Sequence, residues 1–267
     1  MKNRTKLPNV YLGIIIAIMY LPILIVIIYS FNTSRISSIW GGFSLKWYVE
    51  LFRDQSILEA LKNSIVLATL SSLAAAFIGT IAAVGFTRVK LRSSGFVEYL
   101  STLPIMIPEI ILGVVFLIYF SLLGLPFGMT TLIIAHTAFC IPYVFMLVKA
   151  RLAGMDKNLA EAARDLGASG PRAFLDITFP LILPAIASGM LLAFAMSFDD
   201  VVISIFVTGV NTNTLPIKIY TQLKTGVTPK INALCTLMFF VTVMLGLLFV
   251  FITNITNKRT TTKESSQ

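Results

Sequence analysis

Three acidic side chains lie within or beside long apolar stretches of this 267-residue sequence. Asp199 and Asp200 interrupt an apolar run from about residue 179 to residue 210, and Glu109 comes just before an uncharged run over residues 110–148. An ionisable group at the centre of a membrane costs about 3 kcal/mol even on a lenient scale, so it is a functional candidate by default. We therefore interpret Glu109, Asp199 and Asp200 as candidates for a functional site.

Helix geometry gives these residues an expected depth. If a helix begins near Pro184, the two aspartates lie roughly 23 Å along it. Glu109 follows Glu98 by eleven residues, roughly 16 Å into an apolar layer about 30 Å thick. Glu109 either belongs to a functional site or is interfacial or paired with a neighbouring helix. Adjacent residues diverge by about 100° on a helix, so one aspartate can face a pore while the other caps or pairs.

These residue types favour a cation as the ligand. Neighbouring carboxylates without a base in the same span make a negative site, and Ser197 adds a hydroxyl. A flexible polyamine needs separated carboxylates with aromatic faces between its ammonium groups. Trp47 is the candidate aromatic residue, although its ring-rich segment could instead be an interfacial aromatic belt. The rings in this segment are Trp40, Phe43, Trp47, Tyr48 and Phe52.

Other kinds of site fit the sequence less well. One histidine and two cysteines exclude a metal cluster, and Cys140 and Cys235 are expected to pack as small hydrophobic residues. His136 is either a hydrogen-bonded packing residue or a proton relay, and the first is the commoner case. The sequence contains no G-x-x-x-x-G-K-[ST] motif for ATP, and no nucleophile–base arrangement accompanies the aspartates to suggest a membrane enzyme.

The composition is that of an integral membrane protein, because 57% of the residues are hydrophobic and only 12% are charged. We expect an all-α protein with six transmembrane helices. The first two are predicted at about residues 10–29 and 64–87. Spans three and four lie between about residues 99 and 148, separated by a turn at 124–128. Span five, from about residue 179 to 210, must be long or broken, and the last is expected at 231–253.

The positive charges predict the orientation of these helices. Fourteen of the 21 Lys and Arg residues lie at the two termini and in the loops around residues 88–92 and 149–172. With six crossings these segments share one side, which the excess of Lys and Arg marks as cytoplasmic. The net charge of +9 follows this clustering and does not indicate a nucleic acid partner.

The central cytoplasmic loop contains a short polar helix with the features of a docking element. Asn158, with Glu161 three residues later, resembles a capping box, and Gly167 stands where the helix should end. An apolar stripe on this helix suits a groove on another protein. The stripe consists of Leu159, Ala162, Ala163 and Leu166. The alternative is an amphipathic loop helix without a partner.

The same loop resembles the EAA loop of bacterial ABC importer permeases. The matching residues are Glu161-Ala162-Ala163, Gly167, Ile177 and Phe179-Pro180, with Phe179 where that pattern usually has Leu. The resemblance implies a coupling helix seated on a cytoplasmic ATPase subunit. Its residues would be Leu159, Glu161, Ala162, Ala163, Leu166 and Gly167.

Four further runs resemble the second permease subunits of bacterial spermidine/putrescine importers. They are FNTSR from Phe31, GGFSLKWY from Gly41, SFDDVVIS from Ser197 and TLPIKIY from Thr214. The resemblance implies a type I importer fold and a multi-pass protein of the bacterial plasma (inner) membrane. It also implies a heterodimer with a second permease subunit, two ATPase subunits that bind ATP and Mg, and an extracellular or periplasmic polyamine-binding protein.

We therefore predict a permease subunit, not itself an enzyme and without a cofactor of its own, that moves spermidine or putrescine into the cytoplasm. The alternatives are an ABC importer permease for another small solute, and a secondary cation transporter or channel. The predicted regions are residues 1–59 (cytoplasmic N-terminus, first span and extracellular aromatic segment), 60–253 (core of five helices with coupling loop 149–178) and 254–267 (disordered cytoplasmic tail).

Overall fold

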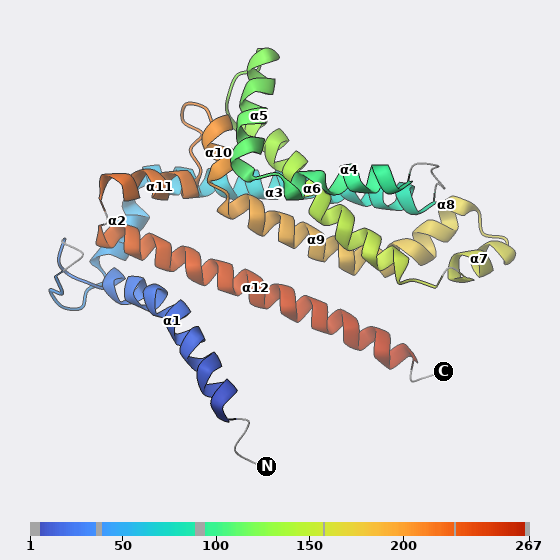
Figure 1. Ribbon diagram of the computed structural model, residues 1–267, viewed down its shortest axis with the longest axis horizontal. Helices are drawn as coiled ribbons and strands as arrows, with labels where there is room; N and C mark the ends of the chain where they lie inside the picture. Colours follow the sequence, from blue (N-terminus) through green and yellow to red (C-terminus); the bar gives the residue numbers. More distant parts are fainter. Residues whose placement is uncertain (1–5, 36–38, 89–93, 157, 227, 265–267) are drawn as a thin grey trace. The chain divides into compact units, whose positions relative to one another are not determined.

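A computed structural model describes residues 6–35, 39–88, 94–156, 158–226 and 228–264 (Figure 1). These residues form helices, with one isolated β-bridge between Asn32 and Phe43, which agrees with the predicted all-α class. The chain divides into two compact units. One comprises Met1–Glu59 with Lys218–Met244, and the other comprises Ala60–Ile217 with Leu245–Gln267.

Four helices among the described residues are long and apolar enough to cross a membrane, judged by length and composition. They are Val10–Ser30, Gln55–Thr87, Met129–Ala153 and Gly170–Asp199. They agree with predicted spans one, two, four and five. The stretches expected as spans three and six contain shorter apolar helices, Glu109–Leu122 and Pro229–Met244.

Span three is divided because prolines interrupt it. α4 (Ser94–Met106) contains Pro104 and ends before Pro108, which lies directly before α5 (Glu109–Leu122). A proline has no backbone N–H to donate and disfavours helical geometry in the residue before it. Figure 1 shows α4 and α5 pointing in clearly different directions. Glu109 is therefore the first residue of a new helix and not a position within a continuous span.

The first unit contains α1 (Lys6–Ser30), α2 (Lys46–Arg53), the start of α3 (Gln55–Arg88), most of α11 (Leu215–Thr225) and the first part of α12 (Pro229–Glu264). Asp54 joins two of these helices. Its Oδ1 accepts the backbone N–H groups of Ser56 and Ile57 at 3.0 and 3.3 Å, so it caps α3, and its Oδ2 pairs with Lys230 at the start of α12. The hydrogen bond from Lys230 lowers the pKa of Asp54 below its usual value.

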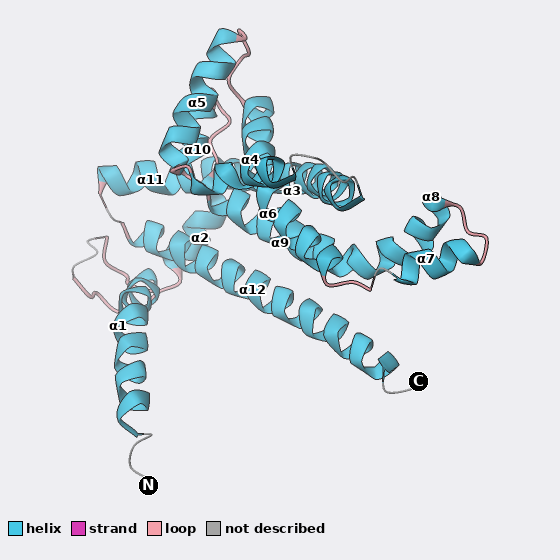
Figure 2. Ribbon diagram, turned by 45° about the vertical axis from the view of Figure 1, so that its right-hand side comes forward, coloured by secondary structure: helices cyan, strands magenta, loops and turns pink. Residues whose placement is uncertain are grey.

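The second unit is built around α6 (Met129–Ala153), which contributes much of its buried core and packs along α9 (Phe179–Asp199). Figure 2 shows these two helices side by side. Two glycines permit close approach to Val144 of α6: a Cβ at Gly79 would lie 3.0 Å from its Cβ, and one at Gly189 would lie 3.2 Å from its Cα. Small residues at such contacts are typical of helices that pack within membranes.

Several predicted features fall at the edges of the described chain. α12 is helical to Glu264 and so extends across most of residues 254–267, which were expected to be disordered. The last three residues lie outside the described part. So do Lys2, Arg4, Lys90, Arg92 and Lys157, which contributed to the charge argument for orientation.

The Gly79 contact predicts a position-specific loss of stability. Gly79→Ala places a methyl group against Val144 and the Ile141 carbonyl, and overpacking of this kind costs about 1–3 kcal/mol. Gly85→Ala, on the same helix with no neighbour within 4 Å of its added Cβ, should leave stability unchanged or slightly raised. Thermal unfolding of both variants in detergent measures the difference. Equal melting temperatures would refute the close packing.

The Asp54–Lys230 pair predicts a pH-dependent contribution to stability. Because folding lowers the pKa of Asp54, the pair stabilises fully above the unfolded value of about 3.9, and this stability is lost as pH falls through the lower folded value. Lys230→Met should cost up to about 1 kcal/mol at pH 7 and progressively less below pH 4. Melting temperatures of wild type and variant across this range give the measurement. A difference that stays constant down to pH 2.5 would contradict the assignment.

Candidate functional site

The helix of span five is interrupted between α9 and α10 (Val202–Val207), and this break in the helix lies at Asp200. Its backbone is extended, with φ −68° and ψ 128°, so span five is broken rather than long. The Asp200 carboxylate turns back onto the next helix: Oδ1 accepts the N–H of Ile203 at 3.2 Å and Oδ2 that of Ser204 at 2.9 Å. Asp200 therefore caps α10, and its side chain is only 4% exposed.

His136 of α6 lies against both sides of this break. Its Nδ1 is 2.8 Å from the Ser197 hydroxyl on α9, and its Nε2 is 3.0 Å from the Ser204 hydroxyl on α10. The same Nε2 is 3.4 Å from Oδ2 of Asp200. The Ser197 hydroxyl is also 2.9 Å from that of Ser71 on α3. Four helices thus meet at one buried polar network, in which Ser197 is a bonded structural member.

The other two acidic candidates are exposed. Asp199 is the last residue of α9 and is exposed although it is adjacent to buried Asp200. Glu109 is exposed at the first turn of α5. Its carboxylate is near enough to Asp200 and to the Tyr143 hydroxyl of α6 to interact electrostatically with both. No ion pair joins Glu109 or Asp199 to a lysine or arginine in the described residues. The structure brings these carboxylates into one acidic region, with two of the three accessible.

Trp47 belongs to the first unit and serves its packing. The indole is 5% exposed, and its Nε1 donates to the backbone carbonyl of Asn32 at 2.5 Å. The side chain of Asn32 in turn accepts the N–H groups of Ser34 and Gly41. Phe43, stacked on Phe31, is 71% exposed, so the more accessible ring face in this segment belongs to Phe43.

The predicted coupling helix is present as α7 (Asn158–Asp165), which has no buried residue. Leu159 is 46% exposed, Leu166 is 90% exposed, and Glu161 and Ala162 are also exposed, while Ala163 is intermediate. Figures 1 and 2 show α7 and α8 (Gly170–Ala173) at the opposite end of the second unit from α5 and α10. The helix thus presents an apolar face that this unit leaves uncovered.

The two ends of α7 are set by different residues. Gly167 has φ +91°, its N–H bonds to the Arg164 carbonyl, and the N–H of Ala168 bonds to the Ala163 carbonyl, so the predicted glycine stop is confirmed as a Schellman motif. The predicted cap at Asn158 is wrong. Asp156 caps instead, because its Oδ1 accepts the Asn158 N–H at 2.9 Å.

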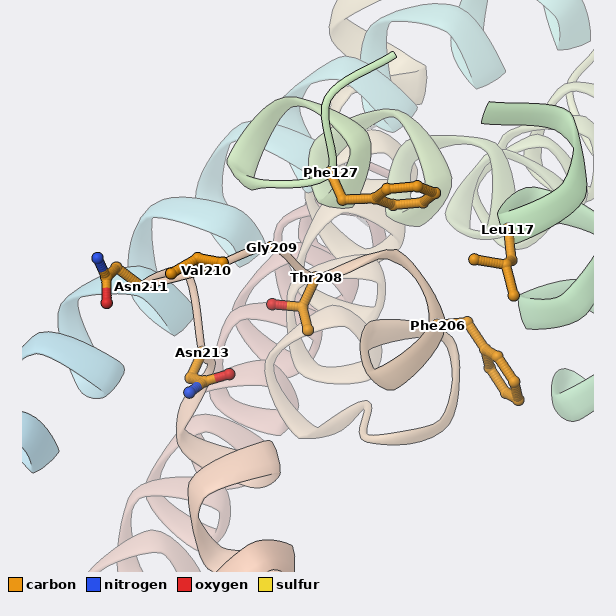
Figure 3. Close-up of a pocket in the computed structure, with 8 residues that line it drawn as sticks. All are labelled: Leu117, Phe127, Phe206, Thr208, Gly209, Val210, Asn211 and Asn213. Atoms are coloured by element: carbon orange, nitrogen blue, oxygen red, sulfur yellow. The ribbon is translucent and has the colours of Figure 1, made fainter. Parts of the chain in front are cut away.

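An open cavity of about 710 Å³ lies beside the loop that follows α10 (Figure 3). Phe127 and Phe206 line one part of it, and the side chains of Asn211 and Asn213 line another. The remaining lining residues are Leu117, Thr208, Gly209 and Val210. None of the lining residues is charged, so this cavity is distinct from the acidic region.

Three residues of the network at the break are hard to recognise from sequence alone. Ser71 and Ser204 stand in apolar helices where a single hydroxyl is unremarkable, and the sequence allows His136 to be either a hydrogen-bonded packing residue or a proton relay. The geometry agrees with the first interpretation of His136. A signal for the cap existed at Asp200, because Ile203 follows it by three residues, a spacing at which a side chain can accept the backbone N–H in the first turn of a helix. The described residues contain no group of three or more His, Cys, Asp or Glu suited to hold a metal ion.

The comparisons with known proteins converge on membrane transport. Residues 75–262 match the model of the family described as "Binding-protein-dependent transport system inner membrane component". The chain is 41% identical over 228 residues to the spermidine/putrescine transport system permease protein PotC of Escherichia coli K12, covering 85% of this chain and 86% of that protein. It is 42% identical over 226 residues to the putrescine permease protein PotI of the same strain, covering 82% and 80%.

Solved structures support the same fold. A bacterial ABC transporter that imports the acidic polysaccharide alginate aligns with a TM-score of 0.71 at 14% identity, covering 90% of this chain and 93% of that one. An amino acid ABC transporter aligns with a TM-score of 0.60 at 15% identity, covering 78% and 98%. At these identities the likeness concerns the fold alone.

Proposed function

Because this chain belongs to the family of binding-protein-dependent transport system inner membrane components, we propose that it is a permease subunit of an ATP-driven importer of polyamines. The observation that carries the proposal is the 41–42% identity to spermidine/putrescine and putrescine permeases over more than four fifths of the chain. The acidic region gives it a chemical basis, since polyamines are flexible polycations and the two accessible carboxylates are free of basic partners in the described residues.

The cargo path uses the acidic residues in two ways. Glu109 and Asp199 are accessible and meet ammonium groups directly, as charge-assisted hydrogen-bond acceptors. Asp200 and Ser197 do not touch the cargo, because both are buried, and they support the backbone through their hydrogen bonds in the network at the break. Trp47 supports the outer segment through its packing, and the exposed ring of Phe43 provides an aromatic face there.

The helix α7 is the proposed contact through which ATP hydrolysis in the ATPase subunits drives transport. Leu159 on α7 and Leu166 directly after it, both exposed, seat in a groove of a cytoplasmic ATPase subunit, which supplies ATP and Mg. The complete importer contains a second permease subunit, two ATPase subunits and an extracellular or periplasmic polyamine-binding protein. The chain crosses the bacterial plasma (inner) membrane six times, with both termini in the cytoplasm.

Uptake by the reconstituted importer tests this function. Proteoliposomes that contain both permease subunits and the ATPases, supplied with the binding protein, should accumulate labelled spermidine or putrescine only when ATP is present on the ATPase side. Uptake driven by an ion gradient without ATP would identify a secondary transporter. ATP-dependent uptake of another solute, with no polyamine uptake, would keep the importer and reject its cargo.

Removing the charge of Asp199 should weaken uptake without loosening the complex. Asp199→Asn deletes one ionic contact, worth about 1.5–3 kcal/mol, so uptake at low polyamine concentration should fall about 10- to 100-fold. Glu50→Gln, which neutralises a partly exposed carboxylate paired with Lys46 on α2, is the control and should transport normally. The measurement is the initial uptake rate beside ATPase co-purification. Equal rates for both variants would remove Asp199 from the path.

The apolar end of α7 should be needed for ATPase attachment. Leu166→Ser removes a side chain that is 90% exposed directly after α7, so the ATPases should co-purify poorly and transport should fall at least about tenfold. Val210→Ser changes an equally exposed side chain at the other end of the unit and should leave attachment intact. Pull-down of the ATPases with each variant provides the comparison. Normal attachment with Leu166→Ser would contradict the docking role.

A further inference from the structure

His136 contacts the end of α9, the break and the start of α10 together. Its ring is completely buried on α6, and its contacts are Ser197, Asp200 and Ser204. Those three residues span the eight positions over which the chain changes direction. A ring held at both nitrogens has little freedom to rotate, so it defines one geometry for the break.

The hydrogen bonds around the ring have a consistent direction. The Ser71 hydroxyl donates its single proton to the Leu67 carbonyl at 2.7 Å, so toward Ser197 it can only accept. Ser197 therefore donates to Ser71 and must accept from Nδ1–H of His136. Nε2 is then an acceptor for the Ser204 hydroxyl, so it touches Oδ2 of Asp200 without donating to it. Asp200 is instead bonded by the backbone N–H of Ser204. Every polar group in the chain of contacts has a partner when the imidazole is neutral.

The break separates the two adjacent aspartates. Asp200 is retained as the cap of α10 beside His136, and Asp199, one residue earlier, is exposed. α5, which begins with Glu109, is held close to the same region, because Gly113 lies directly against the ring of Phe206 on α10. The direction in which Asp199 points thus depends on how α9 ends and α10 begins.

We propose that His136 is a positioning residue for cargo recognition: by clamping Ser197 and Ser204 across the break, it keeps Asp200 as a helix cap and presents Asp199 to the polyamine. This inference rests on the proposed transport function. It gives the two aspartates different tasks, with Asp199 in contact with the cargo and Asp200 holding the backbone that carries Asp199. His136 itself touches no substrate.

Three substitutions at His136 separate positioning from filling space. Leucine fills the volume but bonds to neither serine. Asparagine can restore a donor toward Ser197, and glutamine an acceptor toward Ser204. We expect His136→Leu to raise the KM of polyamine uptake about tenfold, with little change in ATPase co-purification, and His136→Asn or His136→Gln to recover part of the loss. A leucine variant with wild-type KM would overturn the proposal.

A second readout does not depend on transport. In a background without Cys140 and Cys235, Asp199→Cys in the assembled complex is labelled with a positively charged thiol reagent. The labelling rate should change at least about fivefold on addition of His136→Leu and return toward its original value with His136→Asn or His136→Gln. Melting temperatures of the same variants identify any that are unfolded.

The KM of uptake and the labelling rate together distinguish failure of the proposed transport function from failure of the proposed role of His136. A wild-type complex that moves no polyamine, although labelling depends on His136 as expected, would refute the proposed function and leave the clamp at the break standing. A complex that transports polyamine, but whose KM and labelling rate are both indifferent to His136→Leu, would refute the positioning role alone.

Discussion

A carboxylate buried among apolar helices must find hydrogen-bond donors, and this requirement shapes the second unit. Asp200 accepts the backbone N–H groups of Ile203 and Ser204 in the first turn of α10. This geometry requires α9 to end at Asp199 and the backbone at Asp200 to be extended. His136 then fills the remaining polar space and ties α6 to both helices. The break, the burial of Asp200 and the exposure of Asp199 are consequences of the same constraint.

The site and the coupling helix occupy opposite ends of one helical path. From Gly170 to Asp199 the chain is continuously helical, through α8, the π-helix η1 (Phe174–Thr178) and α9, a length of about 45 Å. α7 precedes this path, and the break at Asp200 ends it. In the proposed importer, a displacement of α7 by an ATPase subunit would reach the break through α9, which is packed along α6. The residues that we propose to meet cargo and those that we propose to bind the ATPase are therefore distinct but joined by one continuous helical path.

Much of this arrangement could be predicted from sequence, where a local signal is strong. Gly167 correctly predicted the end of α7, because glycine readily adopts its φ of +91°. Four of the expected spans are matched by helices of sufficient length and apolarity. Other features depend on contacts that sequence does not reveal. The sequence does not distinguish the two adjacent aspartates, because Asp200 is buried through contacts with His136, which is distant in sequence, and with the next helix. Nor does it distinguish Asp156, which caps α7, from Asn158.

The central claim is that Asp199 meets the cargo while Asp200 faces His136. It is tested most directly by a high-resolution electron cryomicroscopy map of the assembled importer with spermidine bound. We expect an ammonium group within hydrogen-bond distance of the Asp199 carboxylate, with Asp200 still bonded to the backbone of α10. A map in which Asp200 turns away from His136 to bind spermidine, and Asp199 does not touch it, would contradict the account.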